Sequence, residues 1–341
     1  MEAALGELAH GRAAALELEG EPGIGKTRLL AELSRRADER GHLVLTGSAS
    51  ELERELPFWV FVDALDDYVR SVPPAVLDGL PQDELARVLP PAGGVPRALA
   101  MPDERHRAHQ ALRELLGVLA ARQPLVLALD DLHWADSGSL ELLGALLRRP
   151  AAGPVLLVLA VRPRQIPDAL LGVLERAHRA GTVSRLSLSP LSRDEARTLL
   201  GDTADTVYDE SGGNPFYLQQ LARAVGRTGA LPRDVTAALA EELALLSPEA
   251  RALLQGAAVA GDPFAPELAA AAAGDLPREL EVLDELLATD LVRPTDVPRR
   301  FRFRHPLVRR AVYDGAPGGW RLGAHERAAA ALAAAGASAA A

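Results

Sequence analysis

Two hydrophobic patterns alternate along the first 190 residues. Short apolar or alternating runs, typical of strands, occur at residues 13–19, 42–46, 125–129, 155–161 and 182–188. The all-apolar runs LVLAL and VLLVLAV are typical of parallel strands buried on both faces. Apolar residues at helical spacing fill residues 1–12, 27–40, 58–69, 103–122, 137–148 and 166–179. This alternation predicts an α/β fold, a parallel sheet with helices on both faces.

A proline-rich stretch interrupts the alternation. Residues 71–101 hold six of the 25 prolines, among them the pairs Pro73-Pro74 and Pro90-Pro91. Such spacing predicts short helices broken by turns.

The pattern becomes entirely helical after Pro190. Ser192 and Glu195 form a capping-box pattern, and helical periodicity then continues to about residue 245. Ser247-Pro248 opens a further helix, with proline at its first position. A compact helical segment reaches about residue 288, and two short β-like stretches follow at 290–293 and 301–304. Helix, helix, helix and hairpin in this order outline a winged helix, and an alanine-rich helical tail begins at Trp320.

Composition excludes several classes of protein. The chain has no cysteine, so it forms neither disulfides nor thiolate metal sites. It shows no secretory signal and no apolar run of the roughly 18 residues that a membrane span needs. We therefore expect a cytoplasmic protein without membrane contact. The net charge of −10 gives no overall attraction to nucleic acid, although a local basic face stays open.

The turn between the first strand and the next helix has the sequence G-x-x-x-x-G-K-T, the phosphate-binding loop. Its glycines let backbone N–H groups form a concave anion site at a helix N-terminus. We expect the loop to bind ATP or ADP, with Lys26 reaching the β-phosphate and, in ATP, the γ-phosphate, and with the Thr27 hydroxyl binding Mg²⁺. The alternative is a glycine-rich turn with a chance lysine. The predicted nucleotide-binding residues are Gly20, Glu21, Pro22, Gly23, Ile24, Gly25, Lys26, Thr27 and Arg28.

Lysine usage supports this prediction. Of the 37 basic Lys and Arg residues, Lys26 is the sole lysine. A chain that uses arginine everywhere else keeps lysine where a compact ammonium fits a phosphate cradle.

A second nucleotide signature follows the strand at 125–129. We predict that Asp130 binds Mg²⁺ and that Asp131 polarises the attacking water, although a strand leading into an Asx turn is the alternative. Arg162 follows the strand at 155–161, where a γ-phosphate sensor would lie; a structural arginine is the alternative. Lys26, Asp131 and Arg162 are thus the predicted catalytic residues. Trp134 is expected to pack, and His133 to orient water or a carbonyl group.

Six phrases together resemble the signal-transduction ATPases with numerous domains, the STAND class of P-loop NTPases. More narrowly, they are similar to the N-terminal part of large ATP-binding LuxR-family, MalT-like transcriptional regulators. The phrases are EGEPGIGKTRLL (19–30), ELPFWVFVDALDDYV (55–69), LVLALDDLHWADSGSL (125–140), LLVLAVRP (156–163), SGGNPFYLQQL (211–221) and FRFRHPLVRRAVY (301–313).

The resemblance implies a nucleotide-binding domain (1–190), a helical lid (191–245), a winged helix (246–314) and the start of a further helical region (315–341). ADP would hold a closed form, and ATP with a small-molecule or protein inducer would open it and allow self-oligomerisation. Pro215 matches the lid proline near adenine, and His305 the histidine that touches the ADP β-phosphate. Otherwise Gly-Asn-Pro is an ordinary turn and His305 a buried structural histidine.

Three departures qualify the resemblance. The Gly-Arg-Glu segment that helps related proteins bind adenine would precede this sequence, which starts inside the following helix. Pro306 stands where the related motif has Asp. The helical-repeat arm and the LuxR-type helix-turn-helix do not occur within the sequence, so we do not expect direct DNA binding by that element.

Four functions are compatible with these patterns. Asp131 stands where a faster enzyme would have Glu, so the leading hypothesis is an ATP/ADP switch with slow hydrolysis. The alternatives are a DNA-binding regulator using the arginines between 299 and 310, an AAA+ motor, and a scaffold that no longer binds nucleotide.

Overall fold

The computed structural model describes residues 1–90, 99, 101–225, 231–274 and 276–334. Two compact units divide the chain, Met1–Ser189 and Pro190–Ala341. Each unit has its own hydrophobic core, so each is described by itself.

The first unit is built on a five-stranded parallel sheet in the order β2-β3-β4-β1-β5. The strands are β1 (Ala14–Glu19), β2 (Leu43–Ser48), β3 (Leu125–Asp130), β4 (Val155–Val161) and β5 (Ser184–Ser187). The predicted α/β class is confirmed. The order places β4 between β1 and β3, and this brings the ends of three strands side by side at one sheet edge.

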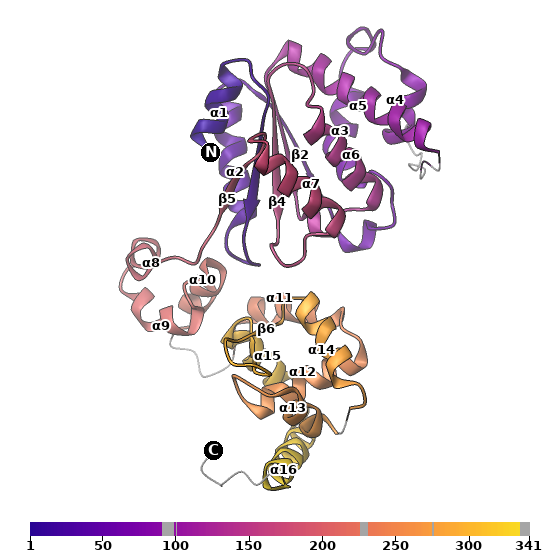
Figure 1. Ribbon diagram of the computed structural model, residues 1–341. Helices are drawn as coiled ribbons and strands as arrows, with labels where there is room; N and C mark the ends of the chain where they lie inside the picture. Colours follow the sequence, from indigo (N-terminus) through magenta and orange to yellow (C-terminus); the bar gives the residue numbers. More distant parts are fainter. Residues whose placement is uncertain (91–98, 100, 226–230, 275, 335–341) are drawn as a thin grey trace. The chain divides into compact units, whose positions relative to one another are not determined.

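Helices cover both faces of this sheet (Figure 1). On one face α1 (Glu2–Ala9) and α2 (Lys26–Glu39) pack on alternate strand residues such as Leu16 and Leu18. The intervening residues, such as Leu157 and Leu159, face the other layer. That layer contains α3 (Trp59–Ser71), α5 (Pro102–Arg122), α6 (Ser137–Arg148) and α7 (Asp168–Arg179). Every residue of β3 and β4 is buried, which explains why both strands are apolar except for Asp130 at the end of β3.

Several element boundaries differ from prediction for local reasons. The strand predicted at 182–188 starts only at Ser184, because Thr182 N–H donates to Ala177 O at the end of α7 (3.0 Å). The helix predicted from residue 166 begins at Asp168, after the N-cap Pro167. In the described part of 71–101, short elements occur as expected: η2 (Pro74–Val76) and α4 (Gln82–Val88). Pro91 lies outside the described residues. The short η1 (Glu51–Glu53) and η3 (Leu132–Trp134) were not predicted.

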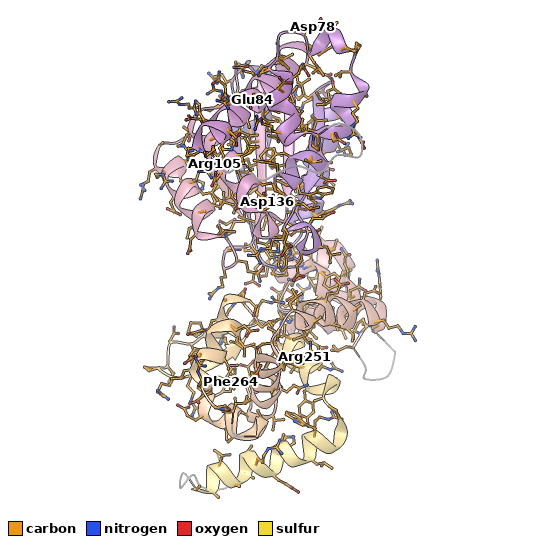
Figure 2. The ribbon with its side chains drawn as sticks, turned by 90° about the vertical axis from the view of Figure 1, so that its right-hand side faces the viewer. Asp78, Glu84, Arg105, Asp136, Arg251 and Phe264 are labelled. Carbon is orange, nitrogen blue, oxygen red and sulfur yellow. The ribbon has the colours of Figure 1, made fainter. Side chains whose placement is uncertain are left out.

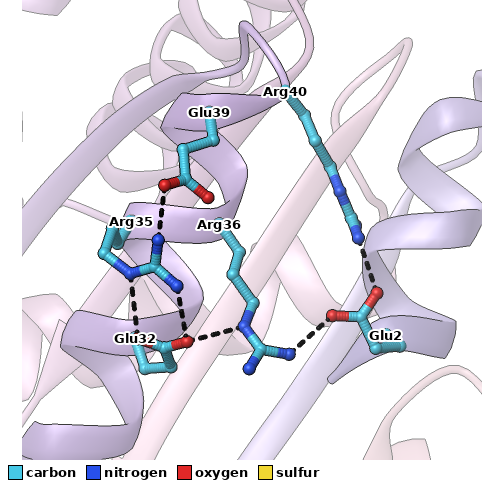
Figure 3. A network of polar contacts seen from close by, with 6 residues as sticks. All are labelled: Glu2, Glu32, Arg35, Arg36, Glu39 and Arg40. Carbon is cyan, nitrogen blue, oxygen red and sulfur yellow. Dashed lines mark hydrogen bonds and ion pairs between the residues drawn. The ribbon is translucent and has the colours of Figure 1, made fainter.

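An ion-pair network joins α1 to α2 (Figure 3). Glu2 accepts from Arg36 at 2.8 Å and from Arg40 at 2.6 Å, and Arg36 also donates to Glu32 at 2.7 Å. These side chains are partly or largely exposed, so the network contributes little to the stability of the unit.

The second unit is mostly helical in its described part. Its elements are α8 (Arg193–Leu200), α9 (Thr203–Ser211), α10 (Pro215–Ala224), α11 (Arg233–Ala244), α12 (Pro248–Ala260), α13 (Pro266–Ala273), α14 (Glu279–Ala288), β6 (Val292–Pro294), β7 (Phe301–Phe303), α15 (Pro306–Gly315) and α16 (Gly318–Ala334). Ser192 caps α8 in the predicted capping box, and Ser247 caps α12.

Phe264, labelled in Figure 2, is fully buried in the second core. Its backbone exchanges two hydrogen bonds with Phe301, and its ring centroid lies 5.7 Å from that of Phe303. The β6–β7 hairpin is thereby attached to the helices. The element order α12, α13, α14, β6, β7 follows the predicted sequence, while its assignment as a winged helix stays a prediction.

None of the helices in the described ranges combines the length and hydropathy needed to cross a bilayer.

Candidate nucleotide site

The predicted phosphate-binding loop is the turn between β1 and α2. Gly23 and Gly25 have φ values of 73° and 109°, a region that L side chains rarely adopt. At Gly20 a Cβ would lie 2.6 Å from Ile24 Cγ2, so the loop closes only on glycine there. Gly20 N–H also donates to Val161 O (3.3 Å), which attaches the loop to the end of β4. Arg28, at the other end of the predicted set, is exposed on α2.

Lys26 is the first residue of α2 and is buried, with 6 % of its surface exposed. Its Nζ donates to the carbonyl oxygens of Gly20 (2.9 Å) and Glu21 (3.1 Å). Burial and, less strongly, the nearby Arg162 lower the pKa of Lys26 to about 8, against the opposing charges of three carboxylates. The Lys26 ammonium therefore binds carbonyl oxygens of its own loop, which compensate its charge only in part.

Thr27 and Asp130 are brought into direct contact. The Thr27 hydroxyl donates to Asp130 Oδ2 at 2.7 Å, although the two residues are 103 positions apart. Among the described residues no cluster of three or more His, Asp or Glu side chains could hold a metal by itself. A hydroxyl and one carboxylate fit a magnesium ion that takes its remaining ligands from phosphate and water.

Asp131 adopts a left-handed backbone with φ 50°. Its N–H donates to Asp130 Oδ1 at 2.8 Å, which stabilises this unusual conformation. Burial raises the pKa of Asp131, and the charge of Asp130 adds to the shift, while Arg162 and Lys26 oppose it. The two adjacent carboxyl groups are thus held in different environments.

Arg162 follows β4 and lies between the ends of β1 and β3. Its Nη2 is 3.8 Å from Asp131 Oδ1, and its Nη1 donates to Gln165 Oε1 at 3.4 Å. Its Nε is buried without a hydrogen-bond partner among the described residues. A buried N–H of this kind fits an anionic ligand that the protein itself does not supply.

His133 is buried beside this group. Its Nδ1 lies 3.7 Å from Asp131 Oδ1, and neither ring nitrogen has a hydrogen-bond partner within the described part of the chain. Burial lowers the pKa of His133 to about 2, with Arg162 and Lys26 adding to the shift. The imidazole is therefore neutral at any working pH. Its ring centroid is 5.1 Å from that of Trp134.

Asp136, labelled in Figure 2, links two helices, and this role was not predicted from sequence. Its carboxylate caps α6 by accepting from Ser139 N (2.9 Å), and it also accepts from Phe58 N (2.9 Å) and Trp59 N (3.3 Å) at the start of α3. One buried side chain therefore joins two helix N-termini beside Asp130 and Asp131. The N-cap on α6 has a sequence signal, Asp before a helical pattern, but its contact with α3 has none.

The two predicted residues of the second unit lie near each other. Pro215 is the first residue of α10, and His305 caps α15 by accepting from Leu307 N (3.2 Å). His305 Nε2 is 2.8 Å from Ser211 O, in the turn that leads to Pro215. A carbonyl only accepts, so Nε2 carries the proton. The imidazole ring also lies 4.5 Å from the ring of Tyr217, centroid to centroid.

The arginines between 299 and 310 are largely paired within the unit. Arg304 is buried and donates to Glu242 at 2.8 Å. Arg299 pairs with Glu267, Arg310 with Glu210, and Arg309 donates to Ala258 O.

Comparisons with known proteins agree with this geometry. Residues 1–158 match the family model of the AAA ATPase domain. An uncharacterised protein of Rhizobium meliloti (strain 1021) is 28 % identical over 357 residues, which cover 89 % of this chain and 33 % of that protein. The chain thus spans about a third of the length of the curated relative it matches.

Two solved structures are similar in fold. The Walker-type ATPase PABY2304 of Pyrococcus abyssi superposes with a TM-score of 0.52 at 14 % identity, covering 91 % of this chain and 93 % of its own. The Aeropyrum pernix ORC2 protein gives a TM-score of 0.51 at 15 % identity, covering 97 % and 92 %. The fold is that of a P-loop NTPase, and the site together with the family match supports a nucleotide-binding ATPase of the AAA type.

Proposed function

We propose that this chain is an ATP/ADP-binding regulatory switch that hydrolyses ATP slowly. The observation that carries the proposal is the meeting of three strand ends: Lys26 beyond β1, the Thr27–Asp130 pair at β3, and Arg162 beyond β4. The solved ORC2 protein was crystallised with ADPNP and ADP, which supports nucleotide as the ligand of this fold.

The residues divide the work by charge and position. Lys26 would exchange its loop carbonyls for phosphate oxygens, and Thr27 with Asp130 would hold Mg²⁺, whose charge would offset that of the phosphates. Asp131 accepts a hydrogen bond from the attacking water, and Arg162 donates to the γ-phosphate. Because Arg162 lies 3.8 Å from Asp131, a γ-phosphate that attracts the guanidinium also changes the surroundings of that carboxylate. ATP and ADP are thereby distinguished.

The slow hydrolysis of ATP in this proposal follows from the choice of Asp131 as the group that polarises water. Asp131 is one methylene shorter than Glu, and Arg162 competes with water for its carboxylate. Turnover well below 1 s⁻¹ is expected of a switch, whereas a rate on the order of 1 s⁻¹ or more would favour an AAA+ motor.

We extend the proposal to the second unit as the part that reports the nucleotide state. His305 already contacts the turn that leads to Pro215, through Ser211 O. A ligand bound at one of these two places would therefore change the position of the other. Pro215 would pack near adenine and His305 would donate to the ADP β-phosphate, in the manner of STAND regulators of the LuxR, MalT-like group. An inducer and ATP would release this closed form and allow self-association.

DNA binding through the second unit is the weaker alternative. Three of the arginines that would contact phosphates are paired with carboxylates, and Arg304 is buried. A steep salt dependence of DNA binding by the full chain would support that alternative instead.

The central experiment is nucleotide binding by Lys26→Ala. We expect affinity for ATP and ADP to fall at least a hundredfold, because a buried ammonium-to-phosphate contact is removed. Arg35→Ala, an exposed residue on the same helix, is the matched control and should bind normally. Unchanged binding by Lys26→Ala in calorimetric titrations would refute the proposal.

A further inference from the structure

A polar pocket lies outside the predicted nucleotide-site residues, between α5 and α6. Its volume is about 350 Å³. His106, His109 and Arg113 line it from α5, and Arg148 and Arg149 line it from the end of α6. This volume lies at the lower end of the range of small-molecule sites.

The pocket is cationic in a chain whose net charge is −10. No carboxylate lines it. Arg113, Arg148 and Arg149 make no ion pair with any residue in the described ranges, whereas Arg107, on the same helix as Arg113, is paired with Glu84. Three uncompensated guanidinium groups around one hollow produce a locally positive potential that attracts anions.

His109 shares the cationic surroundings of the pocket. Its Nε2 is shielded from solvent and has no hydrogen bond to a described residue. Burial lowers the pKa of His109, and His106, Arg105 and Arg148 lower it further against the opposing Glu141. The positive charges around this imidazole therefore outnumber the one nearby carboxylate, and this favours an anion in the pocket.

The pocket is separate from the nucleotide site. The helix α6 begins at Ser137, beside Asp136, and runs for 12 residues to Arg148. At 1.5 Å per residue its two ends are about 18 Å apart. Arg148 and Arg149 therefore lie far from Asp136, and none of the residues that line the pocket is one of the predicted nucleotide-site residues. Its floor is firm, because Leu146 is buried in the core of the first unit.

We propose that this pocket binds a small phosphorylated anion with two or more phosphate groups. Guanidinium groups form paired hydrogen bonds with phosphate oxygens, and three of them around one hollow match a ligand that carries several negative charges. An extended acidic peptide would need a groove longer than a 350 Å³ pocket. The site would make the ATPase unit responsive to a second anionic ligand.

The test is calorimetric titration of sodium pyrophosphate into the full chain carrying Lys26→Ala, which weakens anion binding at the loop. We expect Arg113→Gln/Arg148→Gln in that background to reduce affinity at least tenfold, because each charged hydrogen bond is worth tenfold or more. The matched control is Arg122→Gln/Arg179→Gln, which removes two exposed arginines of the same unit from outside the pocket. It should bind as the parent does.

Three results would overturn the proposal: no pyrophosphate binding at millimolar concentration, equal losses in pocket and control variants, or tighter binding of a hexa-aspartate peptide than of pyrophosphate. If circular dichroism shows that the double variant is unfolded, Arg149→Gln replaces it. Arg149 is exposed, and its removal should still weaken binding several-fold while unchanged binding would count against the site. Pyrophosphate binding at the pocket does not depend on nucleotide binding, so the two proposals can fail separately.

Discussion

At the scale of single residues, Lys26 shows how a binding site stores free energy. Its ammonium is buried and bonded only to carbonyl oxygens, which carry partial charge. Burial lowers its pKa to about 8, so below that pH the folded chain retains a poorly compensated cation. Phosphate oxygens would compensate this charge. Because the buried ammonium destabilises the free protein, its compensation by phosphate favours binding.

If Lys26 binds phosphate as proposed, nucleotide binding should be linked to protonation. The unfolded chain holds this proton up to a pKa near 10.5, so between about pH 8 and pH 10.5 it binds more protons than the folded chain. Stability from this residue thus rises with pH across that window, and below it the residue costs about 3 kcal/mol. Phosphate binding reverses the shift, so ADP should bind with uptake of up to one proton above pH 8.

Calorimetry of ADP binding in two buffers with different ionisation enthalpies measures this uptake. It should grow between pH 7.5 and pH 9, because the unprotonated fraction of the free lysine grows over that range. An uptake that stays at zero throughout would mean that Lys26 keeps its ordinary pKa in the free protein.

At the scale of elements, Asp136 connects the site to the fold. Its carboxylate accepts two backbone hydrogen bonds from α3 and one from α6, and the Ser139 hydroxyl donates to it as well. Since Asp136 lies five residues beyond Asp131, the same contacts hold the loop that follows Asp130 and Asp131.

Asp136→Ala should destabilise the first unit by about 2–4 kcal/mol, because it leaves two helix N-termini uncapped and their buried N–H groups unsatisfied. Denaturant unfolding followed by circular dichroism measures the loss. Asp168→Ala, at the exposed start of α7, is the control and should change stability by less than about 0.5 kcal/mol. Equal effects of the two substitutions would show that Asp136 is an ordinary cap.

The elements also show why sequence predicted some features and not others. The strands and the phosphate-binding loop depend on local periodicity and spacing, so residues 125–129 and Lys26 could be recognised directly. The contact of Asp136 with Phe58 spans 78 positions, and no local pattern carries it. Gly47 is similar: a Cβ there would lie 2.3 Å from Val60 O, a requirement created by the packing of α3 on β2.

At the scale of the whole molecule, the chain joins an ATPase unit to a helical unit in which His305 has a definite hydrogen-bonding state. Its Nδ1 accepts from Leu307 N and its Nε2 donates to Ser211 O. A phosphate that accepted the hydrogen bond from His305 Nε2–H would leave the Ser211 carbonyl oxygen without this donor, in the turn beside Pro215. In the proposed switch, nucleotide and turn would compete for one N–H, which is how a ligand could change the arrangement of the helical unit.

His305→Ala tests this competition on the full chain. If His305 donates to the ADP β-phosphate, the variant should bind ADP roughly ten- to a hundredfold more weakly, since a hydrogen bond to a charged group is worth about 1.5–3 kcal/mol. Loss of affinity should be smaller for ATP, because the closed form is the one that ADP favours. His325→Ala, which removes a histidine bonded to Tyr313 on the same unit, is the matched control. If His305→Ala lowers thermal stability but leaves both nucleotide affinities equal to those of His325→Ala, then His305 serves as a helix cap alone, and the switch must read its nucleotide through Arg162.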